Sequence, residues 1–173
     1  MSLNTIVLVQ PPVQDFYLTK KRTQPYGLAA IAAGLIQQGH KVKIIDALAV
    51  DKSRPMAMPA RFSSLAPLYG PKDLSRFSLF HQFVHFGYSF EHVAHLVRQE
   101  TPALVGISAL FTAYSGQAVE TARAIRRFNP GVPIVMGGHH ATHYPQTLLK
   151  EPALDYVIRG EGERPMAGLC RAL

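Results

Sequence analysis

Residues 104–138 read LVGISALFTAYSGQAVETARAIRRFNPGVPIVMGG, and this stretch decides the fold. Two short apolar runs, 104–108 and 133–136, enclose a longer segment in which apolar residues recur at helical spacing. The spaced residues are Ala118, Ala122, Ile125 and Phe128. We expect Ser115 to cap this helix and the Asn-Pro-Gly sequence at 129–131 to end it. The order strand, helix, strand is typical of an α/β unit with parallel strands.

The same alternation continues on both sides of this stretch. Further strands are expected at 5–9, 41–45 and 156–158, and further helices after Pro25, Ser89 and Glu163 and at 145–150. The first two of these helices would bury the apolar sets Leu28, Ile31, Ala32, Leu35, Ile36 and Phe90, Val93, Ala94, Val97. Five buried strands joined by crossover helices predict an α/β fold with a three-layer, doubly wound, parallel sheet of the Rossmann-like, flavodoxin-like type.

Length and composition predict one soluble domain, residues 1–173. The chain is 47% hydrophobic and 17% charged, and no apolar run approaches the roughly 18 residues of a membrane span. The apolar run 6–9 is too short for a secretion signal, so we expect a cytoplasmic protein that binds no membrane. The net charge is +7, but the basic residues are scattered, which argues against nucleic acid. The single cysteine, Cys170, excludes an internal disulfide and a cysteine metal cluster built by this chain alone.

The segment 47–87 interrupts the rhythm of short connections. It contains four prolines, followed by apolar residues at helical spacing after Asp73. Those residues are Leu74, Phe77, Phe80 and Val84. We interpret the segment as an insertion with a proline-containing loop and one extra helix, which either covers the binding edge or is packed without a further role.

Ligands of doubly wound sheets bind beyond the carboxyl ends of the strands. The chain places its unusual residues at those ends: Gln10-Pro11-Pro12, Asp46, Gly106 to Leu110, Gly137 to His140 and Arg159 to Glu163. The pair Gly137-Gly138 lets the backbone pass close to a bulky ligand, because glycine has no Cβ. The Ser108 hydroxyl can donate and accept, and Leu110 points to the same side of the strand. We therefore expect a ligand site at this edge.

Serine-x-leucine after the third strand and the glycine pair after the fourth resemble two signature elements of cobalamin-binding domains, where they flank the buried nucleotide tail. Residues 6–173 resemble the N-terminal domain of cobalamin-dependent radical S-adenosylmethionine proteins. The segments that carry this resemblance are Pro25-Tyr-Gly-Leu-Ala-Ala, Gly39-His-Lys-Val, Asp46, Val105-Gly-Ile-Ser, Gly137-Gly-His-His-Ala-Thr, Pro145, Asp155-Tyr-Val and Arg159-Gly-Glu-Gly-Glu.

The resemblance implies that cobalamin (vitamin B12) is the cofactor. The implied cofactor-binding residues are Pro11, Pro12, Gly106, Ser108, Leu110, Gly137, Gly138, His140, Gly160 and Glu161. It also implies that a large side chain in place of Gly138 would weaken cobalamin binding more than folding. The familiar aspartate-x-histidine-x-x-glycine element is missing, because the loop from Gln10 to Phe16 contains no histidine. Cobalamin is therefore expected with its own base displaced from cobalt and with no protein histidine as a metal ligand.

The radical S-adenosylmethionine half of such proteins carries a C-x-x-x-C-x-x-C motif, which this chain lacks. We therefore expect a cofactor-binding module with no catalytic residues of its own, whose reading frame continues past Leu173 into that domain. The implied parent would hold a 4Fe-4S iron–sulfur cluster and S-adenosylmethionine. It would act on a small-molecule substrate, by methyl transfer or by oxidative ring closure of a magnesium porphyrin ester.

Other polar residues leave their roles open. The sequence HQFVH at 81–85 lacks the glutamate of a zinc protease helix, and His92 and His95 are expected on the solvated side of their helix. Of the edge histidines, His139, His140 and His143, we expect His140 to make either a loop hydrogen bond or a cofactor contact. The carboxylates of Glu161 and Glu163 are expected to support a helix N-terminus rather than to act as an acid–base pair.

The sequence also bears on three other functional classes. A nucleotide-binding oxidoreductase would need a glycine-rich turn where Gln10-Pro11-Pro12 stands. A response-regulator-like domain would need an acidic pair at that place and an aspartate where Ser108-Ala109 stands. A sensor or regulatory domain that binds cobalamin, or a domain that has lost cofactor binding, remains an alternative. The sequence beyond Leu173 would separate the sensor from the enzyme module.

Overall fold

The computed structural model describes residues 5–16, 24–69 and 83–173. Its main sheet has five parallel strands in the order β3-β1-β6-β7-β8. The strands are β1 (Thr5–Gln10), β3 (Lys41–Asp46), β6 (Leu104–Ser108), β7 (Ile134–Gly137) and β8 (Tyr156–Val157). This order confirms the predicted flavodoxin-like, doubly wound sheet, in which the first strand lies beside the second and the third.

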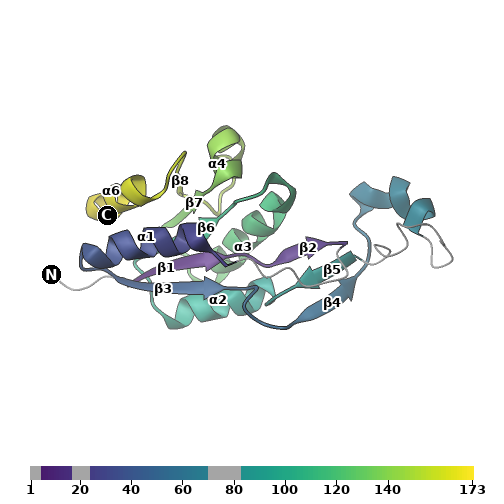
Figure 1. The fold of residues 1–173 in the computed structure, drawn as a ribbon, viewed down its shortest axis with the longest axis horizontal. Helices are drawn as coiled ribbons and strands as arrows, with labels where there is room; N and C mark the ends of the chain where they lie inside the picture. Colours follow the sequence, from purple (N-terminus) through teal and green to yellow (C-terminus); the bar gives the residue numbers. More distant parts are fainter. Residues whose placement is uncertain (1–4, 17–23, 70–82) are drawn as a thin grey trace.

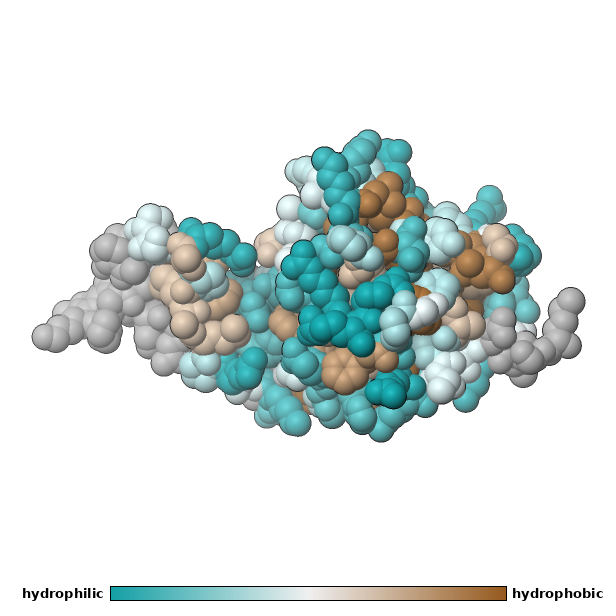
Figure 2. Space-filling view, turned by 180° about the vertical axis from the view of Figure 1, so that it is seen from behind, coloured by the Kyte–Doolittle hydropathy of each residue, from teal (hydrophilic) through white to brown (hydrophobic). Residues whose placement is uncertain are grey.

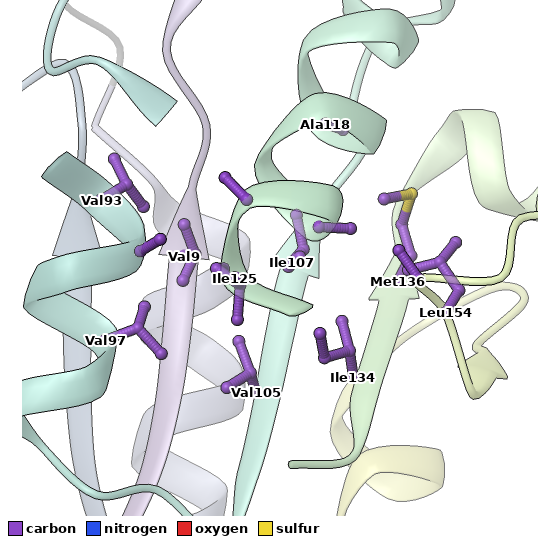
Figure 3. Packing of buried hydrophobic residues seen from close by; sticks show 14 of the residues in the cluster. Val9, Val93, Val97, Val105, Ile107, Ala118, Ile125, Ile134, Met136 and Leu154 are labelled. Carbon is purple, nitrogen blue, oxygen red and sulfur yellow. The ribbon is translucent and has the colours of Figure 1, made fainter. Parts of the chain in front are cut away.

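Helices cover both faces of this sheet (Figure 1). On one face lie α1 (Tyr26–Gln37) and α6 (Glu163–Ala172), and on the other lie α2 (Phe90–Gln99) and α3 (Ser115–Phe128). Figure 3 shows the second face, where Val93 and Val97 of α2 and Ile125 of α3 point toward the strands. The result is the three-layer arrangement that the alternating sequence predicted.

Capping residues and apolar spacing predicted the position of most helices correctly. The Ser89 hydroxyl accepts a hydrogen bond from the His92 N–H and caps α2, as predicted. Ser115 is instead the first residue of α3, and its hydroxyl donates to the Thr112 carbonyl, so the predicted cap at Ser115 is wrong. Ile36 is 57% exposed, so its predicted place on the buried face of α1 is also wrong. The stripe that α1 buries is narrower than the sequence suggested.

A second sheet, which the sequence analysis did not predict, lies beyond the tips of β1 and β3 (Figure 1). It is antiparallel, in the order β2-β5-β4, with bounds β2 (Val13–Asp15), β4 (Ser53–Met56) and β5 (Phe83–Phe86). The helix expected after Asp73 falls mostly outside the described residues, but its last position, Val84, lies in β5. The insertion 47–87 therefore contributes two strands and the 3-10 helix η1 (Ala60–Tyr69).

Short elements complete the carboxyl edge of the main sheet. They are η3 (Thr112–Tyr114), α4 (His139–His143) and α5 (Pro145–Leu148), of which only α5 was anticipated, as a slightly longer helix. Figure 2 shows one face of the molecule, on which hydrophilic residues separate small hydrophobic patches. Within the ranges that the structure describes, no helix combines the length and apolar character needed to cross a membrane.

Candidate functional site

A cavity of about 530 Å³ opens at the carboxyl edge of the main sheet, on the side covered by α1 and α6. Its inner end is made by the buried residues Leu8 of β1, Leu28 of α1, Val135 of β7 and Met166 of α6. Each of these residues is at most 7% exposed. The cavity therefore reaches from the solvent into the hydrophobic cluster that packs between the main sheet and helices α1 and α6.

Gly106 of β6 lies in this inner end. A Cβ atom added at Gly106 would stand 2.9 Å from Leu8 Cδ2 and 3.2 Å from Met166 Cε. The first distance is shorter than real Cβ contacts, so a side chain at Gly106 would displace the end of the Leu8 side chain and press on that of Met166. The residue thus keeps the floor of the cavity compact.

The mouth of the cavity is polar. It contains Ser108, Gln10, Gln24, His139, Glu161 and Glu163. Ser108 is half-buried there. The first turn of α1 also borders the mouth through Tyr26 and Gly27. The Tyr26 N–H donates to the Gln24 carbonyl, and no side chain within the ranges that the structure describes caps the turn. Uncapped N–H groups at a helix N-terminus favour an anion.

The two neighbouring glycines at the end of β7 serve different purposes. A Cβ added at Gly137 would find Ile158 Cβ at 3.7 Å, which is ordinary contact distance, so Gly137 leaves room in the cavity. Gly138 has φ +113, and a Cβ there would lie 2.8 Å from the Ala109 carbonyl oxygen. Backbone conformation by itself therefore favours glycine at position 138. Gly138 also lines the cavity, and the expectation that a large side chain there would weaken cobalamin binding more than folding stays a prediction.

Thr142 links the two glycine-containing loops at this edge. Its hydroxyl donates to the Gly138 carbonyl at 3.0 Å and accepts from the Gly160 N–H at 2.9 Å. The segment 159–163 is thereby held against the loop that follows β7. Thr142 lines the cavity and was missed as a site residue, although the sequence Gly-Gly-His-His-Ala-Thr had been noted.

The structure brings together most of the residues predicted from the sequence. Those that line the cavity are Gly106, Ser108, Leu110, Gly137, Gly138, Gly160 and Glu161. Pro11 and Pro12 are buried after β1 and do not line it, and neither does His140. The apolar inner residues were missed because they belong to the interior of strands and helices. Their only signal in the sequence is the ordinary apolar pattern of a core.

His140 is held by the protein itself. It is 8% exposed, its Nδ1 lies 3.3 Å from Thr112 Oγ1, and its ring stacks on Tyr144 at 5.0 Å between centroids. Burial lowers the pKa of His140 below its ordinary value. His140 thus makes the expected hydrogen bond within the protein, and its contact with a cofactor stays a prediction. Its exposed neighbour His139 borders the cavity.

A second buried histidine, His85, belongs to the small sheet. Its Nε2 lies 2.8 Å from the Tyr88 carbonyl oxygen, so Nε2 carries the proton, and its Nδ1 accepts from Gln14 Nε2 at 3.1 Å. Gln117 Nε2 in turn donates to Gln14 Oε1 at 3.4 Å. Burial lowers the pKa of His85, with a smaller contribution in the same direction from Arg54. This polar chain fastens β2 and β5 to α3.

The lowered pKa values predict how stability depends on pH. The unfolded chain binds protons at His85 and His140 before the folded chain does, so the free energy of unfolding should fall as the pH drops below about 6.5. Burial raises the pKa of Asp46, so protonation of Asp46 favours the folded state as the pH falls. Because a carboxyl group titrates at more acidic pH than histidine, this contribution lies below the range of the histidines. Urea unfolding at a series of pH values between 7.5 and 5.5 measures this slope. H85Q should make the free energy of unfolding depend less on pH. An unchanged slope in H85Q would contradict the contribution of His85 to this dependence.

Among the described residues, no three histidine, cysteine, aspartate or glutamate side chains gather in a way that could hold a metal ion. The cavity therefore offers an apolar floor, a polar mouth and a helix N-terminus, and no cluster of metal ligands within that described part. Such an arrangement suits an organic ligand with an apolar end and polar or anionic groups nearer the solvent.

Comparison with known proteins gives these features a context. The family model "B12 binding domain" matches residues 80–170 of the chain. The cytidylyl-2-hydroxyethylphosphonate methyltransferase of Streptomyces wedmorensis is 29% identical over 159 residues, which are 91% of this chain and 26% of that protein. An uncharacterized methyltransferase of Pyrococcus horikoshii is 30% identical over 176 residues, which are 100% of this chain and 30% of that protein.

A third relative matches over a shorter stretch. The anaerobic magnesium-protoporphyrin IX monomethyl ester cyclase of Rubrivivax gelatinosus is 38% identical over 73 residues, which are 42% of this chain and 13% of that protein. The chain thus spans less than a third of the length of each of these three relatives.

Proposed function

This chain belongs to the B12-binding domain family, and from that premise we propose that it holds cobalamin with the nucleotide tail of the cofactor inside the cavity beside α1 and α6. The observation that carries this proposal is the position of the cavity. It opens at the carboxyl edge of the parallel sheet, where doubly wound folds bind their ligands, and it extends inward beneath the two motifs that flank the tail in cobalamin-binding domains.

The residues present fit the chemistry of the tail. The tail ends in an aromatic benzimidazole, and the inner end of the cavity is lined by Leu8, Val135 and Met166. Its ribose and phosphate are polar, and they suit the mouth, where Ser108 and the uncapped first turn of α1 lie. A volume of about 530 Å³ lies within the range of roughly 300–1,000 Å³ that is usual for small-molecule sites.

Cobalt would then have no strong nitrogen ligand on its lower side. The base is displaced into the cavity, and the described residues after β1, from Gln10 to Phe16, contain no histidine. The His140 side chain, in α4, contacts Thr112 of η3 and stacks on Tyr144 at the end of α4. Cobalamin supplies a cobalt centre that carries a methyl group or an electron, and the chain's own part is to bind and orient it.

We further propose that the chain is the cobalamin module of a larger cytoplasmic radical S-adenosylmethionine enzyme. Two relatives carry the name methyltransferase and one the name cyclase, and this chain spans 26%, 30% and 13% of their lengths. A domain with a 4Fe-4S iron–sulfur cluster and S-adenosylmethionine would act on a small-molecule substrate, by methyl transfer or oxidative cyclisation. The bound cobalamin would be presented to that domain at the carboxyl edge of the sheet.

Comparing cobalamin with cobinamide tests the tail proposal. Cobinamide has the corrin ring but lacks the nucleotide tail and its base. In the cob(I) state the lower base of cobalamin is free of cobalt, so the two corrinoids differ in the tail and not in the ligation of cobalt. Anaerobic calorimetric titration suits a chain that has no tryptophan. We expect cobalamin to bind at least about tenfold more tightly, corresponding to roughly 1.4 kcal/mol from burial of the tail. Equal affinities, or no binding of either corrinoid, would contradict the proposal.

A further inference from the structure

We propose that the inner end of the cavity makes the chain selective for corrinoids whose lower base is a benzimidazole over corrinoids whose lower base is a purine. The inference rests on the proposed function and adds to it the chemical class of base that is accepted. It comes from the lining of the cavity, which changes sharply in polarity between its mouth and its floor.

The floor offers no polar partner from its side chains. Leu8, Val135 and Met166 are 1%, 2% and 2% exposed, and Leu28 is 7% exposed. None of these side chains carries a nitrogen or an oxygen atom, and Gly106 between them has no side chain at all. The polar side chains of the lining are less buried than this floor: Gln10, Ser108 and Thr142 are half-buried, and Gln24, His139, Glu161 and Glu163 are exposed.

The two classes of base differ in the part that would meet this floor. Dimethylbenzimidazole and adenine share an imidazole ring, through which they are attached to the ribose. Their six-membered rings differ, because the benzimidazole carries two methyl groups whereas adenine carries ring nitrogens and an exocyclic amino group. Since the ribose and phosphate suit the mouth, the six-membered ring enters first and reaches the apolar end.

Burial of adenine there removes its amino group and ring nitrogens from water without replacing their hydrogen bonds. An unsatisfied buried polar group usually costs about 1–3 kcal/mol, whereas the benzimidazole methyl groups gain from the same environment. A cost at the lower end of this range already changes affinity by about fivefold. We therefore expect a preference of about tenfold or more for the benzimidazole corrinoid.

Three cob(I) corrinoids titrated into the chain under identical conditions test this inference: cobalamin, its analogue with adenine as the lower base, and cobinamide. The cob(I) state matters because the two bases compete differently for cobalt when they are free to coordinate it. The expected order is cobalamin, then the adenine analogue by about tenfold, then cobinamide. Equal binding of the two base-containing corrinoids, with cobinamide weaker, would overturn the selectivity but leave the tail proposal intact. Cobinamide binding as tightly as cobalamin would overturn both.

A matched pair of variants locates the effect. V135T places a hydroxyl in the cavity floor. V105T places one on the neighbouring strand β6, in the hydrophobic cluster on the opposite face of the sheet, which α2 and α3 cover. The two valines are 2% and 0% exposed, so the expected loss of stability is similar. V135T should narrow the preference for the benzimidazole several-fold, and V105T should leave it unchanged. If both variants changed the ratio of the affinities for the two base-containing corrinoids equally, the lower base would not contact Val135 in the cavity floor.

Discussion

Replacing Gly137 by leucine is expected to weaken cobalamin binding by about a hundredfold while leaving the fold intact. Gly137 ends β7 two residues after Val135, so a side chain there points to the same face of the sheet, into the cavity. The added Cβ meets Ile158 only at ordinary contact distance, 3.7 Å. The remaining atoms of leucine would occupy space that the tail needs, and forced overpacking costs about 1–3 kcal/mol.

Cobinamide supplies the internal comparison for G137L, because it has no tail to displace. Its affinity should stay within about twofold of the wild-type value. Gly131 offers a matched control at the opposite edge of the sheet: it is exposed, and nothing lies within 4 Å of an added Cβ. G131L should bind both corrinoids like the wild type. Parallel losses of cobalamin and cobinamide affinity in G137L would place Gly137 outside the tail site.

G138A should lose about 3 kcal/mol of folding stability, although it adds only one carbon atom. The backbone of Gly138 has φ +113, which L-residues rarely adopt, and the new Cβ would stand 2.8 Å from the Ala109 carbonyl oxygen and 3.2 Å from the Leu110 nitrogen. Both contacts are with backbone atoms. The backbone cannot retreat easily, because Ala109 also accepts a hydrogen bond from the His140 N–H.

Urea unfolding of G138A alongside G137A separates the two neighbouring positions. Gly137 lacks the positive φ and the backbone clash, so G137A should change the free energy of unfolding by less than about 1 kcal/mol. If G138A were as stable as the wild type, the tight turn after β7 would not be needed for folding. Gly138, like Gly137, would then have no special backbone requirement for folding.

The main sheet could be predicted from the sequence because each strand and helix has its own local signal. Leu104 to Ser108 is an apolar run of strand length, and Ser89 precedes a helix whose Val93 and Val97 recur at helical spacing. Parallel strands need crossover connections, and the helices between these strands supply them. The details that were wrong include the burial of Ile36, which depends on tertiary contacts, and the cap at Ser115, which lies one residue inside α3.

The second sheet could not be predicted in the same way. β2 and β4 are three and four residues long, and β4 contains Pro55, which weakens its strand signal. In β5 all four residues are buried, so the alternation of apolar and polar residues that marks a half-buried strand is absent. The pairing of β5 with β2 joins segments about seventy residues apart, which local patterns do not report.

The site was predictable at its rim and not at its floor. Glycines and Ser108 at strand ends are unusual enough to be noticed, and they do line the cavity. Leu8 and Met166 look like any core residues, and only the packing of α6 beside α1 turns them into a cavity wall. Pro11 and Pro12 were included because they follow β1, but the chain there leads into β2 and away from the cavity.

Electron paramagnetic resonance of the protein loaded with cob(II)alamin shows whether the lower base leaves cobalt, as its placement in the cavity requires. A nitrogen coordinated to cobalt splits each cobalt line into three, so the bound cofactor should give lines without triplets. Triplets that vanish in variants of His139, His140 or His143 would identify a protein ligand and contradict the absence of one. Triplets that survive all three substitutions would mean that the base stays on cobalt, which would contradict the placement of the tail in the cavity.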